Sequence, residues 1–203
     1  MNAKSYSKFT PEDVLNLDIK TIAKAVLGKH ETVEPSVFLL QTLADNEGLP
    51  MATEKAKSEH IVAPILKEIR RNNLDKMTYF SGYTFNVDKK RGLVGRCDFI
   101  LSLKPHSINI EAPLFCMVES KSEAPDDANA IAQCIAEMYA ARLFNEQHNN
   151  VHIKIIYGAI TNGYEWIFAK LEGDTAFIDI TNRYPHTDLP RILGALQHII
   201  NQF

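Results

Sequence analysis

Three ionisable residues stand within or directly beside apolar runs, where charges are unusual. Asp98 lies inside the run 97–101, and Glu119 and Lys121 follow the run 114–118. A buried carboxylate without a partner is costly, and two carboxylates that lie together repel each other unless a cation compensates them. Lys121 is one such cation, and a divalent metal ion would be a second. The structural alternative is a buried Lys–Glu pair beside an Asp that faces solvent.

The positions of these charges depend on the strands that carry them. Side chains alternate along a strand, so Glu119 and Lys121 share a face, and Asp98 joins them if its strand is a near neighbour. The residues 88–92 (DKKRG) predict a turn, which makes the two strands before and after it a hairpin. Alternating or continuous apolar residues predict strands at 77–87, 93–103, 112–121, 153–160, 164–171 and 176–180.

The helical segments flank these strands in the sequence. Thr10 and Pro11 begin a helix that we expect to end near Gly28, and a short helix is predicted over 36–44. Pro64 lies inside a long amphipathic pattern and should kink or delay that helix. Further helices are predicted at 54–73, 126–145 and 189–200.

The order of these elements predicts an α/β fold with a mixed sheet that helices cover on both faces. We expect a helical extension over residues 1–50, packed on a core domain over residues 51–203.

The formal net charge of −3 gives no global attraction to nucleic acid, so such binding would need local basic patches. The sequence has neither a membrane-spanning apolar run nor the apolar core of a signal peptide, which predicts a cytoplasmic protein. The three cysteines have no zinc-site spacing and are expected to be buried thiols.

The order of the charged residues resembles the PD-(D/E)xK nuclease superfamily. Asp98 on a hairpin precedes Glu119-x-Lys121 at the end of an apolar strand, Glu59 lies on the helix before them, and Gln133 lies on the helix after them. The segments 58–66 and 161–166 are also similar to the nuclease domain at the start of type I restriction motor subunits and to small stand-alone relatives. The likeness covers roughly residues 55–180. It departs from the usual pattern at Cys97, where Pro is common before the Asp, and at Glu137, where Tyr is common after the Gln.

The resemblance implies a restriction-endonuclease-like fold and metal-dependent hydrolysis of phosphodiester bonds, with DNA as the expected substrate. Mg²⁺ or Mn²⁺ would be the cofactor, because hard cations prefer oxygen ligands. Asp98 and Glu119 would bind the metal directly. The Ser120 carbonyl would be a third ligand, and Glu59 would bind directly or through water.

The same resemblance gives two residues catalytic roles beside the metal ligands. Lys121 would either orient and help deprotonate the attacking water or stabilise the charge that develops in the transition state. Gln133 would orient Lys121 or the water, unless it is only a polar residue on the flank of an amphipathic helix.

Two groups of basic residues could hold nucleic acid near this site, or could simply be solvated charge. Cutting both strands of a duplex usually calls for two sites, which favours a homodimer. One alternative is a nuclease-fold module without turnover that binds protein or nucleic acid, and another is a small-molecule binding domain with the N-terminal helices as a lid. The candidate nucleic-acid contacts are Arg70 and Arg71 at the end of the third helix, and Lys89, Lys90, Arg91 and Arg96 on the hairpin.

Overall fold

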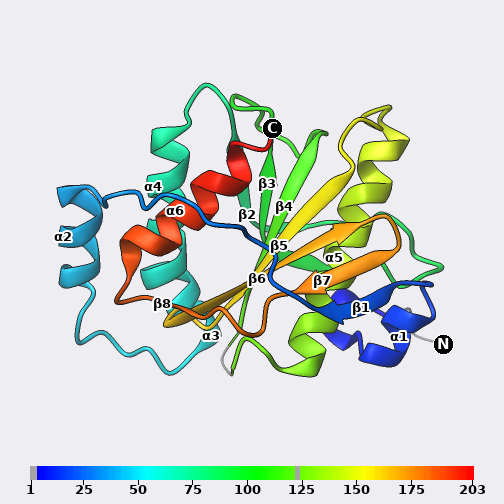
Figure 1. The fold of residues 1–203 in the computed structure, drawn as a ribbon, viewed down its shortest axis with the longest axis horizontal. Coiled ribbons are helices and arrows are strands. Elements are labelled where there is room, and N and C mark those ends of the chain that lie inside the picture. The colour runs from blue at the N-terminus through cyan, green and yellow to red at the C-terminus, as the bar shows by residue number, and fades with distance from the viewer. Residues whose placement is uncertain (1–3, 122–123) are drawn as a thin grey trace.

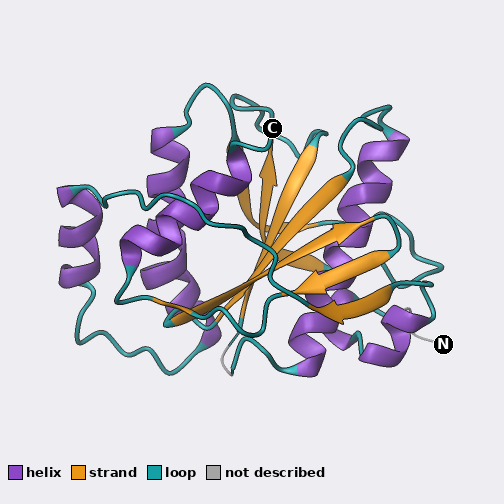
Figure 2. Ribbon diagram, in the orientation of Figure 1, coloured by secondary structure: helices purple, strands orange, loops and turns teal. Residues whose placement is uncertain are grey.

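The computed structural model describes residues 4–121 and 124–203, which form an α/β structure built on an open, mixed sheet of eight strands (Figure 1). The expected α/β class with a mixed sheet is therefore confirmed. Helices lie on both sides of this sheet (Figure 2). The strands are β1 (Lys20–Ala23), β2 (Thr78–Thr84), β3 (Arg96–Ser102), β4 (Leu114–Ser120), β5 (Ile155–Thr161), β6 (Glu165–Glu172), β7 (Thr175–Ile178) and β8 (Tyr184–Pro185).

The strand order is β1-β7-β6-β5-β4-β3-β2, and β8 pairs with β6. The predicted hairpin is present, because β2 and β3 pair in antiparallel fashion and β3 pairs with β4 in the same way. By contrast, β4 and β5 are parallel, so a crossover must connect them. A long helix makes this crossover, and it brings its first turns to the end of β4 where Glu119 lies.

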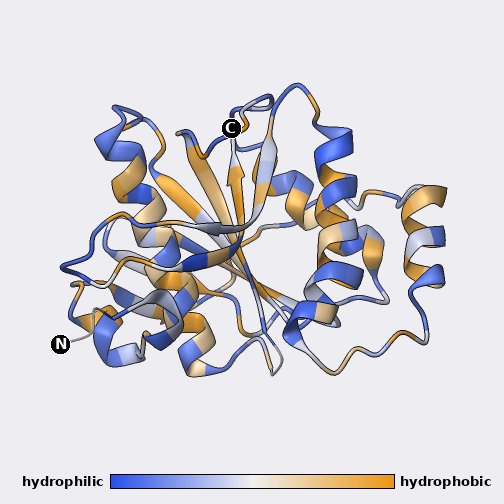
Figure 3. Cartoon of the chain, turned by 180° about the vertical axis from the view of Figure 1, so that it is seen from behind, coloured by the Kyte–Doolittle hydropathy of each residue, from blue (hydrophilic) through white to orange (hydrophobic). Residues whose placement is uncertain are grey.

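Two buried clusters of apolar side chains lie on the two faces of the sheet. Apolar residues are concentrated on the central strands (Figure 3), which is typical of a sheet covered on both sides. Helix α5 covers one face together with α1 and η1, while α4, α6 and α2 lie over the other (Figure 1). The helices are η1 (Tyr6–Lys8), α1 (Pro11–Leu15), α2 (Val37–Asp45), α3 (Glu54–Lys57), η2 (Ser58–Val62), α4 (Ala63–Asn72), α5 (Ala128–Gln147) and α6 (Leu189–Ile200).

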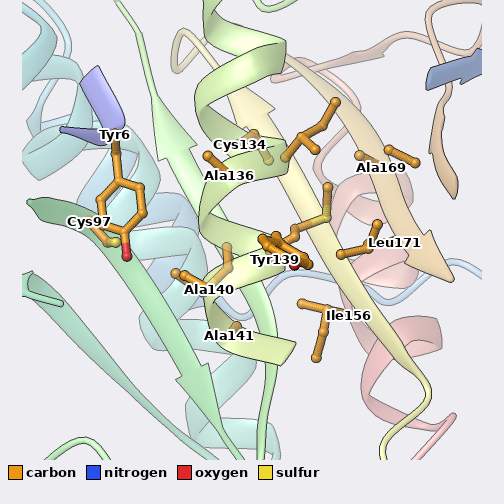
Figure 4. Close-up of a cluster of buried hydrophobic side chains, with 14 of the residues drawn as sticks. Tyr6, Cys97, Cys134, Ala136, Tyr139, Ala140, Ala141, Ile156, Ala169 and Leu171 are labelled. Carbon is orange, nitrogen blue, oxygen red and sulfur yellow. The ribbon is translucent and has the colours of Figure 1, made fainter. Parts of the chain in front are cut away.

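Helix α5 is held tightly against β4 and β5. A side chain at Gly158 on β5 would come within 2.7 Å of Cys134 Sγ, so glycine is needed there for the helix to approach this closely. Near the other end of the helix, the buried Asn145 side chain both donates to and accepts from the backbone of Leu114. Small buried residues of α5, among them Ala136 and Ala140, belong to the same apolar cluster as Tyr6 (Figure 4). The position of α5 relative to β4 is therefore fixed from both ends.

Pro64 interrupts the helix before it, as predicted. The segment before Pro64 forms one turn of π-helix, η2, between α3 and α4. Proline has no amide hydrogen, so it cannot donate to the carbonyl oxygen of His60 one turn earlier. The side-chain amide of Asn46 donates to that oxygen instead, at 2.8 Å. The π-helical turn carries Glu59 at the edge of the sheet.

The expected helix from Pro11 toward Gly28 is wrong beyond residue 15. Helix α1 ends at Leu15, Asp18 adopts a positive φ of 59°, and β1 follows as the edge strand of the sheet, parallel to β7. The N-terminal extension is therefore not purely helical. Its strand escapes a pattern-based prediction because all four side chains of β1 are exposed, which leaves no apolar alternation. Strand β8 was also not predicted, since it is only two residues long.

Candidate active site

Glu119, Lys121 and Gln133 meet at the end of β4, as predicted. The Lys121 ammonium group lies 2.6 Å from Glu119 Oε1 and donates to Gln133 Oε1 at 2.8 Å. The amide nitrogen of Gln133 donates to Glu119 Oε1 at 2.7 Å. Gln133 is buried, so it is more than a polar residue on the flank of α5. Its amide joins the two charged residues of the strand into one closed triangle.

A fourth member of this cluster, Glu137, was seen in the sequence only as a departure from the family pattern. Its side chain is fully buried, and Gln133 Nε2 donates to Glu137 Oε1 at 3.0 Å. Residues four apart on a helix lie on the same face, so the spacing from Gln133 to Glu137 is the signal that would have found it. Cys97 on β3 lies next to the hydroxyl group of Tyr6 (Figure 4), and both residues belong to the buried cluster on the α5 side of the sheet. All three cysteines are buried and free, as expected.

The burial of two carboxyl groups side by side controls the electrostatics of this cluster. Burial raises the pKa of Glu137 to about 8, partly offset by the hydrogen bond from Gln133. Burial also raises the pKa of Glu119, and the neighbouring Glu137 adds to that rise. Like charges in a site of low dielectric cannot both be ionised at little cost. The pair of carboxyls therefore holds a proton at neutral pH when no cation other than Lys121 is present.

Lys121 stays charged in this environment. Burial by itself would lower the pKa of its ammonium group, but the charge and hydrogen bond of Glu119, together with the charges of Glu54 and Glu137, outweigh this effect, and the pKa lies above its usual value. An ammonium group has three N–H donors. Two of them are directed at Glu119 and Gln133, and among the described residues we find no partner for the third. That donor can reach a bound water or an anion.

Asp98 lies on β3, next to the strand that carries Glu119. Its Oδ2 accepts a hydrogen bond from the Ser120 backbone amide at 2.8 Å. Burial raises the pKa of Asp98, and the bond from Ser120 partly offsets the rise. The charge of Asp98 also acts on Glu119. Asp98 is therefore part of the same electrostatic cluster, as the sequence predicted.

Ser120 faces Asp98 through its backbone. On the other side of β4, Thr161 accepts a hydrogen bond from the Lys121 amide, so the amide and carbonyl of Ser120 point toward β3. The Ser120 carbonyl is thus on the side where Asp98 lies, which suits its predicted role as a ligand. The Ser120 hydroxyl is buried without a hydrogen-bond partner among the described residues.

A cleft of about 370 Å³ opens from Asp98 toward α3 and η2. Glu59 lines this cleft, but its carboxylate is exposed and paired with Lys55, and that hydrogen bond lowers its pKa. Glu54, one turn earlier, also lines the cleft, and its charge acts on both Asp98 and Lys121. Glu54 was not singled out in the sequence, because nothing there shows that α3 brings it over the end of β3.

The donor set suits a hard cation that is held by few protein ligands. Among the described residues, no group of three or more His, Cys, Asp or Glu side chains is arranged to hold a metal ion. Mg²⁺ commonly uses only one or two carboxylates, and it keeps waters or takes substrate phosphate oxygens for the rest. Glu119 Oε2 is buried and has no hydrogen-bond partner among these residues, which leaves it available. Asp98, Glu119 and the Ser120 carbonyl could therefore hold Mg²⁺ or Mn²⁺ together with water.

The predicted nucleic-acid contacts lie in three places. Arg96 is exposed and lines the cleft beside Asp98. Arg70 and Arg71 line a second hollow between α2 and α4, where Arg70 contacts Thr78.

The other three contacts lie on the turn between β2 and β3. Lys89 and Lys90 are exposed there, whereas Arg91 contacts Asp88 and the Tyr139 hydroxyl. Of the six predicted contacts, only Arg96 lines the cleft beside Asp98.

Comparisons with models of known protein families give no match for this chain, and a comparison with curated proteins gives none either. The resemblance to PD-(D/E)xK nucleases therefore stays a prediction that rests on the residues and their geometry. None of the helices described is long and apolar enough to cross a membrane.

Proposed function

We propose that this protein is a metal-dependent nuclease of restriction-endonuclease-like fold that hydrolyses phosphodiester bonds of nucleic acid, most simply DNA. The observation that carries the proposal is the triangle of Glu119, Lys121 and Gln133 beside Asp98. These four residues come from two neighbouring strands and the crossover helix. A structural ion pair alone would need neither the buried amide of Gln133 nor a carboxylate on the next strand.

Each residue has a separate task in this reaction. Asp98, Glu119 and the Ser120 carbonyl would hold Mg²⁺ or Mn²⁺, which polarises the phosphate and lowers the pKa of a bound water. Lys121, which stays protonated, directs its remaining N–H toward the phosphate oxygens and stabilises their developing charge. Gln133 fixes the direction of that ammonium group. Arg96 at the cleft adds a positive charge for the nucleic-acid backbone.

The second candidate function is a nuclease-fold module that binds a partner without turnover. One observation favours it: the Glu119 carboxyl is almost fully buried and its Oε1 is already bonded to both Lys121 and Gln133. A site that has lost its metal could be stabilised in just this way, with a proton and a lysine as compensation.

Cleavage assays decide between the two functions. We would incubate supercoiled plasmid and a single-stranded DNA with the protein and Mg²⁺ or Mn²⁺. Matched variants would be Lys121→Ala and Lys154→Ala, the latter an exposed lysine remote from the cleft. Cleavage that needs metal, disappears in Lys121→Ala and persists in Lys154→Ala would support the nuclease. Cleavage equal in all three proteins would show contamination, and binding of DNA without any cleavage would favour the inactive module.

A further inference from the structure

A groove of about 360 Å³ runs between α2 and α4, next to the cleft that Asp98 lines. The groove and the cleft adjoin each other, because Glu59 lines both of them. They are also close along β2, where Tyr79 lines the groove and Ser81 lines the cleft. Two residues of a strand span about 7 Å. Whatever enters the cleft can therefore extend into the groove.

The groove combines an aromatic wall with positive charge. Phe38 on α2 is 57% exposed, and the Lys67 ammonium group lies 5.6 Å from the centre of its ring. Half-buried Tyr79 lines the groove as well, and Arg70 lies beside it. An exposed ring flanked by cations is the combination by which proteins bind unpaired bases and their phosphates.

Two acidic residues line this groove, Glu59, whose exposed carboxylate pairs with Lys55, and Glu68, and each is already paired within the protein. Glu68 is almost fully buried and accepts hydrogen bonds from the Ser36 amide and hydroxyl. It also pairs with Arg71 on the next turn. Its charge is thus compensated inside the protein, which leaves Lys67 and Arg70 to face an incoming anion.

We propose that this groove binds an unpaired nucleotide that flanks the scissile phosphate, and that the substrate is therefore single-stranded nucleic acid or a single-stranded end. This inference rests on the proposed nuclease function and names its substrate class. The base stacks on Phe38, while Lys67 and Arg70 bind its phosphate. A base in a duplex is paired and stacked and would have to be extruded at a cost before it could enter.

The test measures binding without cleavage. Fluorescence anisotropy would follow a labelled oligothymidine with the full chain in EDTA, against a duplex of equal length. Loss of one stacked base should weaken binding by about tenfold in Phe38→Ala, while Phe38→Tyr keeps the affinity. Arg70→Ala should also weaken binding, and Lys154→Ala is the control for general charge. Because Phe38 is exposed, the two substitutions at this position leave the core intact.

The outcomes separate this inference from the nuclease proposal. A protein that cuts plasmid but binds oligothymidine no better than duplex would overturn the inference alone. Binding that is lost in Phe38→Ala, in a protein that never cleaves, would support the groove and contradict the nuclease. If Phe38→Ala weakens an abasic oligonucleotide as much as oligothymidine, the ring does not stack on a base and the inference fails.

Discussion

The buried carboxyl of Glu137 should make the stability of this protein fall as the pH rises. Its pKa is 4.5 in an unfolded chain and about 8 in the folded protein, because burial disfavours the charged form. Between these two values the folded state holds a proton that the unfolded state has released, so the free energy of unfolding decreases with pH. The full difference corresponds to about 5 kcal/mol, at roughly 1.4 kcal/mol for each pH unit. The stabilisation is complete below pH 4.5 and is lost by about pH 8.

The variant Glu137→Gln isolates this effect, since it keeps the size of the side chain but cannot titrate. We would measure urea unfolding at pH 5.5 and at pH 7.5 in EDTA. Between these two values, the free energy of unfolding of the wild type should fall by about 3 kcal/mol more than that of the variant. Glu146→Gln, on the exposed side of the same helix, is the matched control and should follow the wild type. Parallel pH profiles for the wild type and Glu137→Gln would refute the assignment of the proton to Glu137.

Three further predictions test the site and the packing around it. Mg²⁺ at ten times its dissociation constant should stabilise the wild type by about 1.4 kcal/mol, a rise of roughly 3–5 °C in melting temperature that Asp98→Asn should abolish. Gly194→Ala should destabilise the protein by about 1–3 kcal/mol or more in urea unfolding, because its Cβ would come within 2.2 Å of the Glu31 carbonyl oxygen; an unchanged midpoint would mean that residues near Glu31 are not packed on α6. Asn145→Ala should cost about 2–4 kcal/mol, because it leaves the amide and carbonyl of Leu114 buried without partners, and hydrogen exchange at that amide should increase.

The strands of the site could be predicted because their side chains are buried. The continuous apolar run of β4 follows directly from contact with the clusters on the two faces of the sheet, since all seven of its residues are buried. The shared face of Glu119 and Lys121 was predicted from the alternation of side chains along a strand, whereas the resemblance alone placed Gln133 beside them. The edge strand β1 gave no such signal, because hydrogen bonds to β7 hold it and its side chains face solvent.

The spacing from Gln133 places Glu137 on the same face of α5, but the sequence does not show that this face is buried at Glu137. A polar residue on a helix that crosses over a sheet is normally assigned to the solvent side. Here Glu137 shares a face of α5 with Gln133, which lies against Glu119 of β4, and its side chain is fully buried despite its charge.

Because Glu119 is buried, the two candidate functions differ in what neutralises the negative charge of the site. Two carboxyls and one lysine leave an excess negative charge in a site of low dielectric, and that excess must be neutralised by a proton or by a metal ion. In the absence of metal, the proton shared by Glu119 and Glu137 does this. A nuclease must exchange that proton for the cation, so metal binding has to become stronger as the pH rises toward 8. A binding module has no need of the exchange, because the proton and Lys121 together already balance the site.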